Sequence, residues 1–551
     1  MLLGFLTAHA QTPPDAGTLR QQIEQQLPTP LPVEKKPLST VPQDYKAAPG
    51  FSVNVTQFRF AGNTLLSPAQ LDAAVASFLQ RPLDFAGLQQ ATTAVSEAYR
   101  AAGWLVRVYL PRQEITDGIV TLQIVEGRFG QLRIEGNPPR RLTPARAEAT
   151  LLAAQPAGQP INAAALDRAL LVLDDLPGIA ASGNLTPGSG QAETDLLLKM
   201  ADEPLLTGEV GVDNTGARAT GSERVTATVF LNSPLQLGDQ LGANLMHSEG
   251  SDYARLAYSA PVGYDGLRLG INASRLEYDV VTAEFAAAKI NGNSTSAGLD
   301  AQYPLLRSRA QNLYLSAAYD DKTFDNEANA ATTTAYGVRN LSAGLMGNRF
   351  DKWGGGGANQ ASLTLTAGNA DLDGSPNQAA DAATTQTHGR YSKLRYSLSR
   401  QQALTTNFSL YVLLTGQFAS KNLDSSEKFF LGGANGVRAY PSNEGGGSEG
   451  TMLNVELRWR ARANLVVTGF YDWGSATLNT DNRFAGAPAL NRYELDGLGV
   501  SLAWIGPAGL TLKGTYAHRL GENPNRDTTT GKDQDGSLEK GRFWLTATLP
   551  F

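Results

Sequence analysis

Residues 452–460 read MLNVELRWR, and apolar and polar side chains alternate along them. One face of this segment is apolar and consists of Leu453, Val455, Leu457 and Trp459. The residues between them are Asn, Glu and Arg, and residues 510–520, LTLKGTYAHRL, repeat the alternation. A period of two places successive side chains on opposite faces of a β-strand. Each segment therefore predicts a strand with one apolar side and one strongly polar side, as in a membrane-spanning barrel.

About sixteen such segments fill residues 205–551, separated by Gly, Asn, Asp, Ser and Pro, and no convincing helix interrupts them. The last segment is apolar at every second position up to Phe551. We predict a transmembrane β-barrel of about 16 antiparallel strands, closed by its last strand so that no unpaired backbone meets lipid. A soluble β-sandwich and a propeller are the alternatives. Charges on the polar faces disfavour the dry core of a sandwich, and a propeller requires a repeat of about 40–50 residues.

The composition of the whole chain excludes several classes of function. The 551 residues carry a net charge of −6 and include no Cys. A mildly negative chain is unsuited to be a dedicated nucleic-acid binder, which needs a basic surface. The lack of Cys excludes disulfide frameworks, thiolate metal sites and Cys nucleophiles. No uncharged apolar run approaches the ~18 residues of a membrane-spanning helix.

The N-terminal part divides into a leader, a helix and a linker. Residues 1–10 are mostly apolar and end in Ala8-His9-Ala10, the A-x-A form of a secretory cleavage site. We interpret them as the remnant of a signal peptide, with an ordinary apolar stub as the alternative. Residues 11–27 predict a short amphipathic helix, which must dock on protein to be stable, with its apolar stripe at Leu19, Ile23 and Leu27. Residues 28–50 are Pro-rich and predict an extended linker.

Two small domains of similar pattern follow the linker. Residues 51–130 predict the order β-α-α-β-β: a strand over 51–60, helices that begin after Ser67 and near Asp84, and strands over 104–110 and 119–125. Residues 131–204 repeat this order more loosely. We expect each domain to pack its two helices on one face of a three-stranded sheet.

The chain carries no recognisable catalytic motif. The three His residues beyond the leader are far apart in sequence, and no zinc-protease, hydrolase or phosphate-loop spacing occurs. The acidic segments 371–374 and 533–536 lack the full calcium-loop pattern, so we interpret both as solvated turns between strands. We therefore expect no enzyme activity, no cofactor and no metal.

One long Gly-rich segment, residues 424–450, has a cluster of apolar side chains at its middle and also contains Arg438. We expect this segment to fold against protein, where a partly dehydrated Arg needs a carboxylate. In residues 464–474, side-chain parity directs Asp472 into the lumen. An Arg438–Asp472 pair inside the barrel is one interpretation. The other is a surface loop with Arg438 and a solvated lumen charge at Asp472.

Several motifs, in order, resemble the outer-membrane transporters of two-partner secretion (TpsB type), in the superfamily of POTRA-bearing barrels that includes haemolysin and adhesin secretion-activation proteins. The motifs are FRFAGNTLLSPAQL (58–71), YLPRQEITDGIVTLQIVEG (109–127), LTPGSGQAETDLLLKM (185–200), VDNTG (212–216), GGANGVRAY (432–440) and FYDWG (470–474). The loop motif of the superfamily usually ends V-R-G-Y, so Ala439 departs from the common Gly. The rest of the motif is present as Gly436, Val437, Arg438 and Tyr440.

The resemblance implies a fold and a function. It implies POTRA domains at 51–130 and 131–204 in the periplasm, a 16-stranded barrel at 205–551 in the outer membrane of a Gram-negative bacterium, and an Arg438–Asp472 pair. It also implies that the N-terminal helix plugs the pore and that the linker lets it leave. The partner would be a secreted TpsA-type exoprotein with an N-terminal secretion domain, exported by type V secretion. An insertase of the same superfamily is the alternative.

The remaining expectations concern other partners and a third class of function. We expect contacts with outer-membrane lipid and lipopolysaccharide, no binding of nucleic acid, and a monomeric chain. A passive porin or receptor is disfavoured, because diffusion of small solutes requires no peptide-binding domain.

Overall fold

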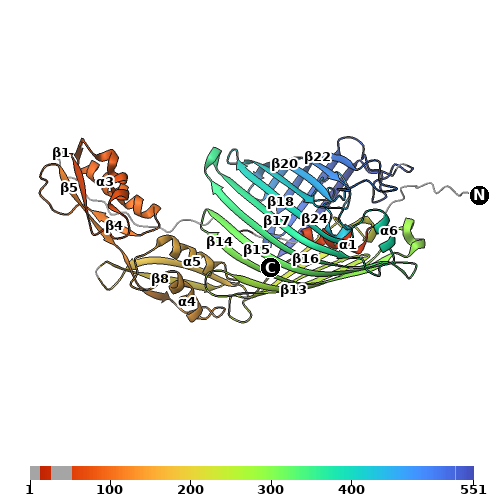
Figure 1. The fold of residues 1–551 in the computed structure, drawn as a ribbon, viewed down its shortest axis with the longest axis horizontal. Helices are drawn as coiled ribbons and strands as arrows, with labels where there is room; N and C mark the ends of the chain where they lie inside the picture. The colour runs from red at the N-terminus through yellow and green to blue at the C-terminus, as the bar shows by residue number, and fades with distance from the viewer. Residues whose placement is uncertain (1–12, 27–30, 32–51, 191, 528) are drawn as a thin grey trace, which may run out of the picture.

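The computed structural model describes residues 13–26, 31, 52–190, 192–527 and 529–551. The molecule is elongated, with two small α/β units at one end and a long barrel at the other (Figure 1). The helix α1 (Ala16–Gln26) lies inside the barrel, against its strands. The leader at 1–10 and nearly all of the linker at 28–50 lie outside the described residues, so those two expectations stay predictions.

The first unit begins with two short strands where the sequence predicted one strand over residues 51–60. The strand β1 (Ser52–Val55) pairs with β3 (Arg81–Asp84), whereas β2 (Gln57–Ala61) joins another sheet. The break at Thr56 has a packing reason, because Val55 and Phe58 are both buried in the core. Because these two residues are three positions apart, an unbroken strand would direct their side chains to opposite faces of the sheet.

The remaining elements of the first unit follow the expected order, apart from the additional strand β3. They are α2 (Pro68–Val75), α3 (Phe85–Ala101), β4 (Val106–Tyr109) and β5 (Ile119–Glu126). Ser67 caps α2 in a reciprocal capping box with Gln70, and Asp84 caps α3 by accepting a hydrogen bond from the Gly87 amide. The sheet order is β2-β5-β4, with β2 parallel to β5.

The second unit repeats this topology. It consists of β6 (Arg128–Glu135), α4 (Pro144–Ala154), α5 (Ala163–Asp174), β7 (Ile179–Pro187) and β8 (Glu193–Asp202). Its sheet order is β6-β8-β7. As in the first unit, one edge strand (β6) is parallel to the central strand β8, and the other edge strand (β7) is antiparallel to it. The shared order supports the prediction of a tandem pair.

Within the described residues, sixteen strands form one closed antiparallel barrel in which β24 pairs with β9. The strands are β9 (Leu206–Asp213), β10 (Arg224–Asn232), β11 (Gln240–Ser248), β12 (Ser251–Pro261), β13 (Arg268–Asp279), β14 (Asn291–Arg307), β15 (Gln311–Ala328), β16 (Ala331–Asp351), β17 (Gly357–Asp371), β18 (Gly389–Ala403), β19 (Phe408–Ala419), β20 (Glu449–Arg462), β21 (Leu465–Thr477), β22 (Arg492–Ile505), β23 (Thr511–Arg519) and β24 (Gly541–Pro550).

The two faces of the barrel follow the alternation of the sequence. Leu457 and Trp459 are exposed on the outer face, whereas Asn454 on the same strand is buried inside. The expectation of no helix in residues 205–551 is wrong at one place, because α6 (Gln378–Ala383) forms in the loop between β17 and β18. Its six residues are too few to produce a helical period in the sequence. Among the helices that the structure describes, none is long and apolar enough to cross a membrane.

The second unit is fixed to the barrel by arginine side chains. Arg307, at the end of β14, binds Asp175 in a bidentate pair, with Nε 2.6 Å from Oδ2 and Nη2 2.7 Å from Oδ1. Arg168 on α5 donates to the carbonyl oxygen of Pro304 at 2.9 Å. The two parallel bonds of a fork-shaped guanidinium restrict orientation as well as distance. These contacts fix the direction in which the second unit leaves the barrel.

The carboxylate of Glu126 holds the start of α2 in the first unit. It accepts hydrogen bonds from the amides of Thr64 and Leu65, at 2.7 and 2.9 Å, and from the Tyr99 hydroxyl at 3.0 Å. Burial alone would raise the pKa of Glu126, but these hydrogen bonds, with that of the Thr64 hydroxyl, hold the pKa below its ordinary value. A lowered pKa in the folded state stabilises the unit above the ordinary carboxyl range.

We expect Glu126→Gln to lower the free energy of unfolding of the first unit by about 1–2 kcal/mol at neutral pH, since it weakens charge-assisted hydrogen bonds. Stability of the parent should fall as the pH drops through the lowered pKa of Glu126, so the difference between the two chains should vanish in acid. Amide exchange of residues 64–71 in the full chain measures both effects. An equal difference at neutral and acidic pH would contradict this role.

Candidate functional site

The helix α1 is the first component of a polar and apolar assembly in the barrel lumen. Ala16 and Leu19 are buried against side chains of the barrel wall, which include Leu276 and Phe324, and Ile23 packs against the same cluster. The predicted apolar stripe therefore contacts the wall at Leu19 and Ile23, and its third member, Leu27, lies outside the described residues.

Arg20 fixes α1 to the wall on its polar side, and sequence reasoning missed this residue. Its side chain is 1% exposed. Nη1 donates to the Ser294 hydroxyl at 2.9 Å, and Nη2 donates to Glu24 at 2.8 Å and to the hydroxyls of Ser274 and Ser296. Nothing in the local sequence distinguishes Arg20 from a solvated helix residue that pairs with Glu24, because its three serine partners lie more than 250 positions away.

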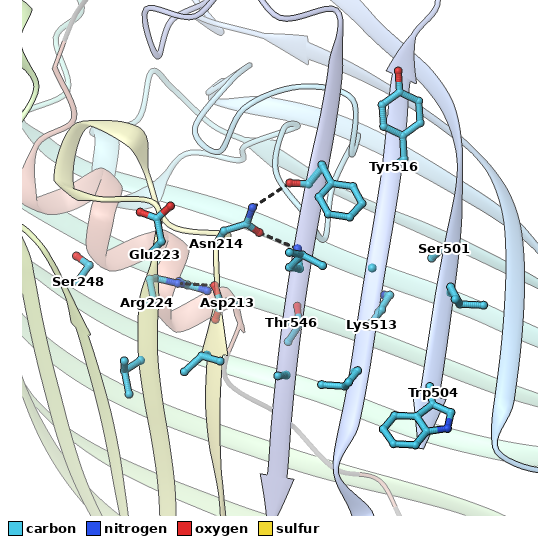
Figure 2. Close-up of a pocket in the computed structure, with 18 of the residues that line it drawn as sticks. Asp213, Asn214, Glu223, Arg224, Ser248, Ser501, Trp504, Lys513, Tyr516 and Thr546 are labelled. Carbon is cyan, nitrogen blue, oxygen red and sulfur yellow. Dashed lines mark hydrogen bonds and ion pairs between the residues drawn. The ribbon is translucent and has the colours of Figure 1, made fainter. Parts of the chain in front are cut away.

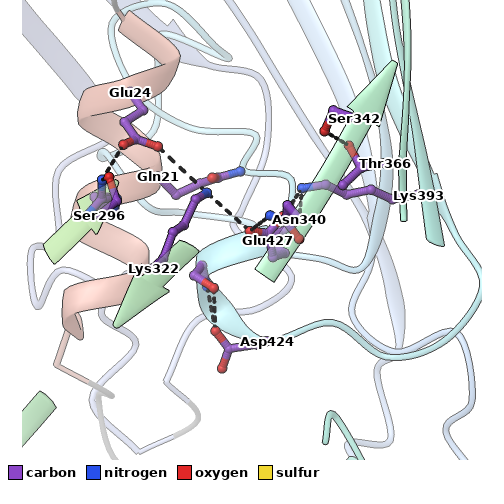
Figure 3. A network of polar contacts seen from close by, with 12 residues as sticks. Gln21, Glu24, Ser296, Lys322, Asn340, Ser342, Thr366, Lys393, Asp424 and Glu427 are labelled. Atoms are coloured by element: carbon purple, nitrogen blue, oxygen red, sulfur yellow. Dashed lines mark hydrogen bonds and ion pairs between the residues drawn. The ribbon is translucent and has the colours of Figure 1, made fainter. Parts of the chain in front are cut away.

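A chain of charges continues from α1 across the lumen (Figure 3). Glu24 lies 3.9 Å from Lys322 Nζ on β15, and the same Nζ lies 3.4 Å from Glu427. Lys393 on β18 also pairs with Glu427, and Asn340 donates to it at 2.8 Å. Glu427 belongs to the short helix η5 (Ser425–Glu427), in the loop after β19. Glu24 on α1, Lys322 on the barrel wall and Glu427 in this loop therefore form a continuous chain of ionic contacts with alternating sign.

Two further hydrogen bonds join α1 and its N-terminal flank to the same loop. Gln21 Nε2 donates to the carbonyl oxygen of Lys428 at 3.0 Å, and the Ser425 hydroxyl donates to Asp15 at 2.7 Å. The helix cannot leave the lumen without breaking both bonds and the Glu24–Lys322 contact.

The loop between β19 and β20, residues 420–448, packs against protein, as the sequence predicted for residues 424–450, and does so inside the barrel. Leu431, Val437, Ala439 and Tyr440 are buried in one cluster with residues of β20–β23. Gly436 is required for close approach, because a Cβ on it would lie 2.0 Å from the Leu431 carbonyl oxygen. The remaining motif residues thus form a packed core that holds Arg438 in place.

The structure brings Arg438 and Asp472 together. Nε lies 2.9 Å from Asp472 Oδ2 and Nη2 lies 2.7 Å from Oδ1, while the Arg438 backbone amide donates to Oδ2 at 3.0 Å. Asp472 is fully buried and Arg438 is 5% exposed. The interpretation of Arg438 as a surface residue is therefore wrong.

Four further side chains complete this centre, and sequence reasoning did not select them. Glu456 accepts from Arg438 Nη1 at 2.8 Å, and Asn454 Nδ2 donates to Asp472 at 2.7 Å. The guanidinium lies 3.5 Å from the ring centre of Phe470, and Trp544 Nε1 donates to the Arg438 carbonyl oxygen at 2.8 Å. The alternation in 452–460 already put Asn454 and Glu456 on the lumen face, but only the strand register shows that they lie beside Asp472.

The two acidic segments that we interpreted as solvated turns differ from each other. Asp533 is buried and bound by Arg519 Nη1 at 2.9 Å, so the interpretation of 533–536 as solvated is wrong. The other segment is exposed, and Asp371, Asp373 and His388 lie close enough there to share a cation. However, His388 Nδ1 accepts the Leu372 amide at 3.1 Å, which leaves the ring proton on Nε2. A protonated Nε2 is not a metal ligand, so this arrangement disfavours a metal.

Comparison with known proteins places the chain in a family. The sequence profile of the haemolysin secretion/activation proteins ShlB/FhaC/HecB matches residues 192–492, more than half of the chain. The profile of the ShlB-type POTRA domain matches residues 53–127, which is the first small unit. The heme/hemopexin transporter protein HuxB of Haemophilus influenzae is 24% identical, over 100% of this chain and 97% of that protein.

Further relatives agree with this assignment. The outer membrane transporter CdiB of Dickeya dadantii is 24% identical, over 85% of this chain and 81% of that protein. The solved structure of CdiB from Escherichia coli has a TM-score of 0.73 at 19% identity, and covers 94% of each chain, which shows a shared fold. The chain belongs to the haemolysin secretion/activation protein family ShlB/FhaC/HecB.

Proposed function

We propose that this chain is the outer-membrane transporter of a two-partner (type V) secretion system and exports a partner exoprotein through its barrel. The observation that carries the proposal is a closed barrel filled by its own N-terminal helix and by an inward-folded loop. The family consists of transporters rather than enzymes, and its POTRA domains lie in the periplasm. The relatives named as transporters, HuxB and CdiB, support the same conclusion.

The exoprotein would first meet the two small units. Each unit has a three-stranded sheet with an antiparallel edge strand, β4 in the first and β7 in the second. An extended peptide can bind such an edge through backbone hydrogen bonds. We propose that the secretion domain of the exoprotein binds these units while extended, next to the barrel end to which Arg307 and Asp175 fix them.

Export then requires that α1 leaves the lumen. A barrel of 16 strands is wide enough for an aqueous channel, but α1 and the loop at 420–448 occupy it. We propose that α1 is the plug, that the linker at 28–50 lets it leave, and that Arg438 and Asp472 keep the loop in place. Contacts with lipid and lipopolysaccharide and a monomeric state stay predictions.

Secretion tests the proposal as a whole. We express the chain with the exoprotein encoded beside it and assay the medium for that exoprotein. The intact chain should release it, an empty vector should not, and Arg438→Ala should reduce release at least about tenfold, since breaking a buried pair costs about 3–5 kcal/mol. Arg483→Ala is the matched control, because Arg483 pairs with Asp481 on the exposed surface.

Two outcomes would contradict these assignments. Undiminished secretion by a folded Arg438→Ala barrel would remove the role of the pair, while leaving the transporter function intact. Equal release with and without the chain would contradict export itself. The insertase alternative then predicts slower assembly of other outer-membrane barrels when the chain is deleted.

Channel recordings in planar bilayers test the plug. We expect Arg20→Ala to raise the fraction of time in the high-conductance state about tenfold or more, because it removes buried charge-assisted hydrogen bonds worth about 1.5–3 kcal/mol each. Gln25→Ala, at an exposed position of α1, is the control and should change little. Conductance that stays unchanged when residues 13–26 are deleted would show that α1 does not block the pore.

A further inference from the structure

The seam between the first and last strands has a short backbone ladder. The pairs described across it run from Asp213 with Thr546 to Glu209 with Pro550. On its other side, β24 pairs with β23 up to Gly541. Residues 541–545 of β24 therefore extend beyond the ladder with β9.

The Asn214 side chain continues the seam where the ladder ends (Figure 2). Its Oδ1 accepts the Leu545 amide at 2.8 Å, and its Nδ2 donates to the Phe543 carbonyl oxygen at 3.0 Å. A carboxamide carries one carbonyl acceptor and an N–H donor, as a peptide group does. The Asn214 carboxamide thus pairs two peptide groups of β24, the Leu545 amide and the Phe543 carbonyl, that backbone groups of β9 would have paired if the ladder had continued.

The chain around Asn214 explains why the backbone pairing does not continue past this residue. Asp213 accepts hydrogen bonds from the Thr215 amide at 2.8 Å and from the Thr215 hydroxyl at 2.7 Å, which turns the chain inward. Arg224 on β10 holds the Asp213 carboxylate from the neighbouring strand at 3.0 Å. Strand β9 therefore ends at Asp213, and Asn214 reaches β24 through its backbone amide, which donates to the Leu545 carbonyl oxygen at 3.3 Å, and through its side chain.

The surroundings make these two hydrogen bonds important. An apolar hollow on the outer face of the barrel borders the seam, lined by residues that include Val212, Val225, Val500, Leu512, Phe543 and Leu545. A peptide group left unpaired beside such a surface lacks the water that would satisfy it. The Asn214 carboxamide pairs the Phe543 carbonyl and the Leu545 amide at this place.

On the lumen side, the loop that carries Arg438 bridges the same seam. Trp544 on β24 donates to the Arg438 carbonyl oxygen, and the Ser442 hydroxyl donates to the Thr215 carbonyl oxygen at 3.0 Å. The loop thus touches both flanks, one residue away from the bonds of Asn214. At this level the seam is bridged by the backbone amide and carboxamide of Asn214 and, on the lumen side, by the loop.

We propose that Asn214 is a positioning residue that closes the outer part of the β9–β24 seam. Its side chain extends the pairing beyond the backbone bond between Asn214 and Leu545, so removing the carboxamide unpairs the Leu545 amide and the Phe543 carbonyl while the ladder from Asp213 to Glu209 stays paired. The assignment goes beyond the proposed export activity and does not depend on it.

Hydrogen exchange of the full chain in lipid nanodiscs tests the proposal. Asn214→Ala should accelerate exchange of the Leu545 amide about tenfold or more, because that amide loses its acceptor. Asn214→Asp keeps a carboxyl oxygen for Leu545, so its exchange should stay within about threefold of the parent. Asn369→Ala is the matched control, since β17 is paired on both sides of Asn369.

Each other outcome would overturn the assignment. Parental exchange of Leu545 in Asn214→Ala would show that the carboxamide does not hold the seam. Equally fast exchange in the Ala and Asp variants would show that the acceptor is not what matters. Loss of protection throughout β13–β17 in Asn214→Ala would show a role in the whole barrel, and not at the seam.

Discussion

The enclosed guanidinium of Arg438 is the interaction on which the interior of the barrel depends. It is bound by Asp472 and Glu456 and lies over the ring of Phe470. A charge in such a place is costly without partners, and removing one partner costs about 3–5 kcal/mol. Because the loop at 420–448 is anchored here, its other parts have fixed positions. Glu427 then faces α1, and Ser442 and the Arg438 carbonyl face the seam.

The closed barrel explains why so many charges lie inside the molecule. The outer face must be apolar for lipid, so polar side chains of every strand point into the lumen. A helix or loop that enters this space meets serines, lysines and carboxylates and must carry complementary groups. Arg20 and Glu24 on α1 supply them, beside the apolar contacts of Leu19. The helix is therefore held by specific polar pairs that water can replace, which agrees with the proposed release of α1 from the lumen.

The fold was largely predictable from the sequence because its signal is local. Alternation with a period of two revealed the strands and placed Asp472 inside, and capping signals located α2 at Ser67. The break at Thr56 was not predictable, because it depends on where Val55 and Phe58 pack in three dimensions. The burial of Asp533 was missed for a similar reason, since its partner Arg519 approaches it only in the folded barrel.

The candidate site was predictable in part. A loop with both glycines and aromatics pointed to inward folding, and a charged residue in it pointed to a carboxylate. The chain Glu24–Lys322–Glu427 was not predictable, because its members come from three elements separated by about 100 residues or more. Which strands face each other across a lumen depends on the number of strands and on their stagger, and the sequence pattern predicted the number but not the stagger.

The central claim is that α1 and the loop form one connected assembly in the lumen. A double-mutant cycle of Glu24→Gln and Glu427→Gln, read out as the fraction of time the pore is open in planar bilayers, tests it most directly. We expect the free energies of opening to be non-additive by about 0.5–3 kcal/mol, because both carboxylates act on Lys322. Additive effects, within about 0.3–0.5 kcal/mol, would contradict the claim and show that helix and loop are held independently.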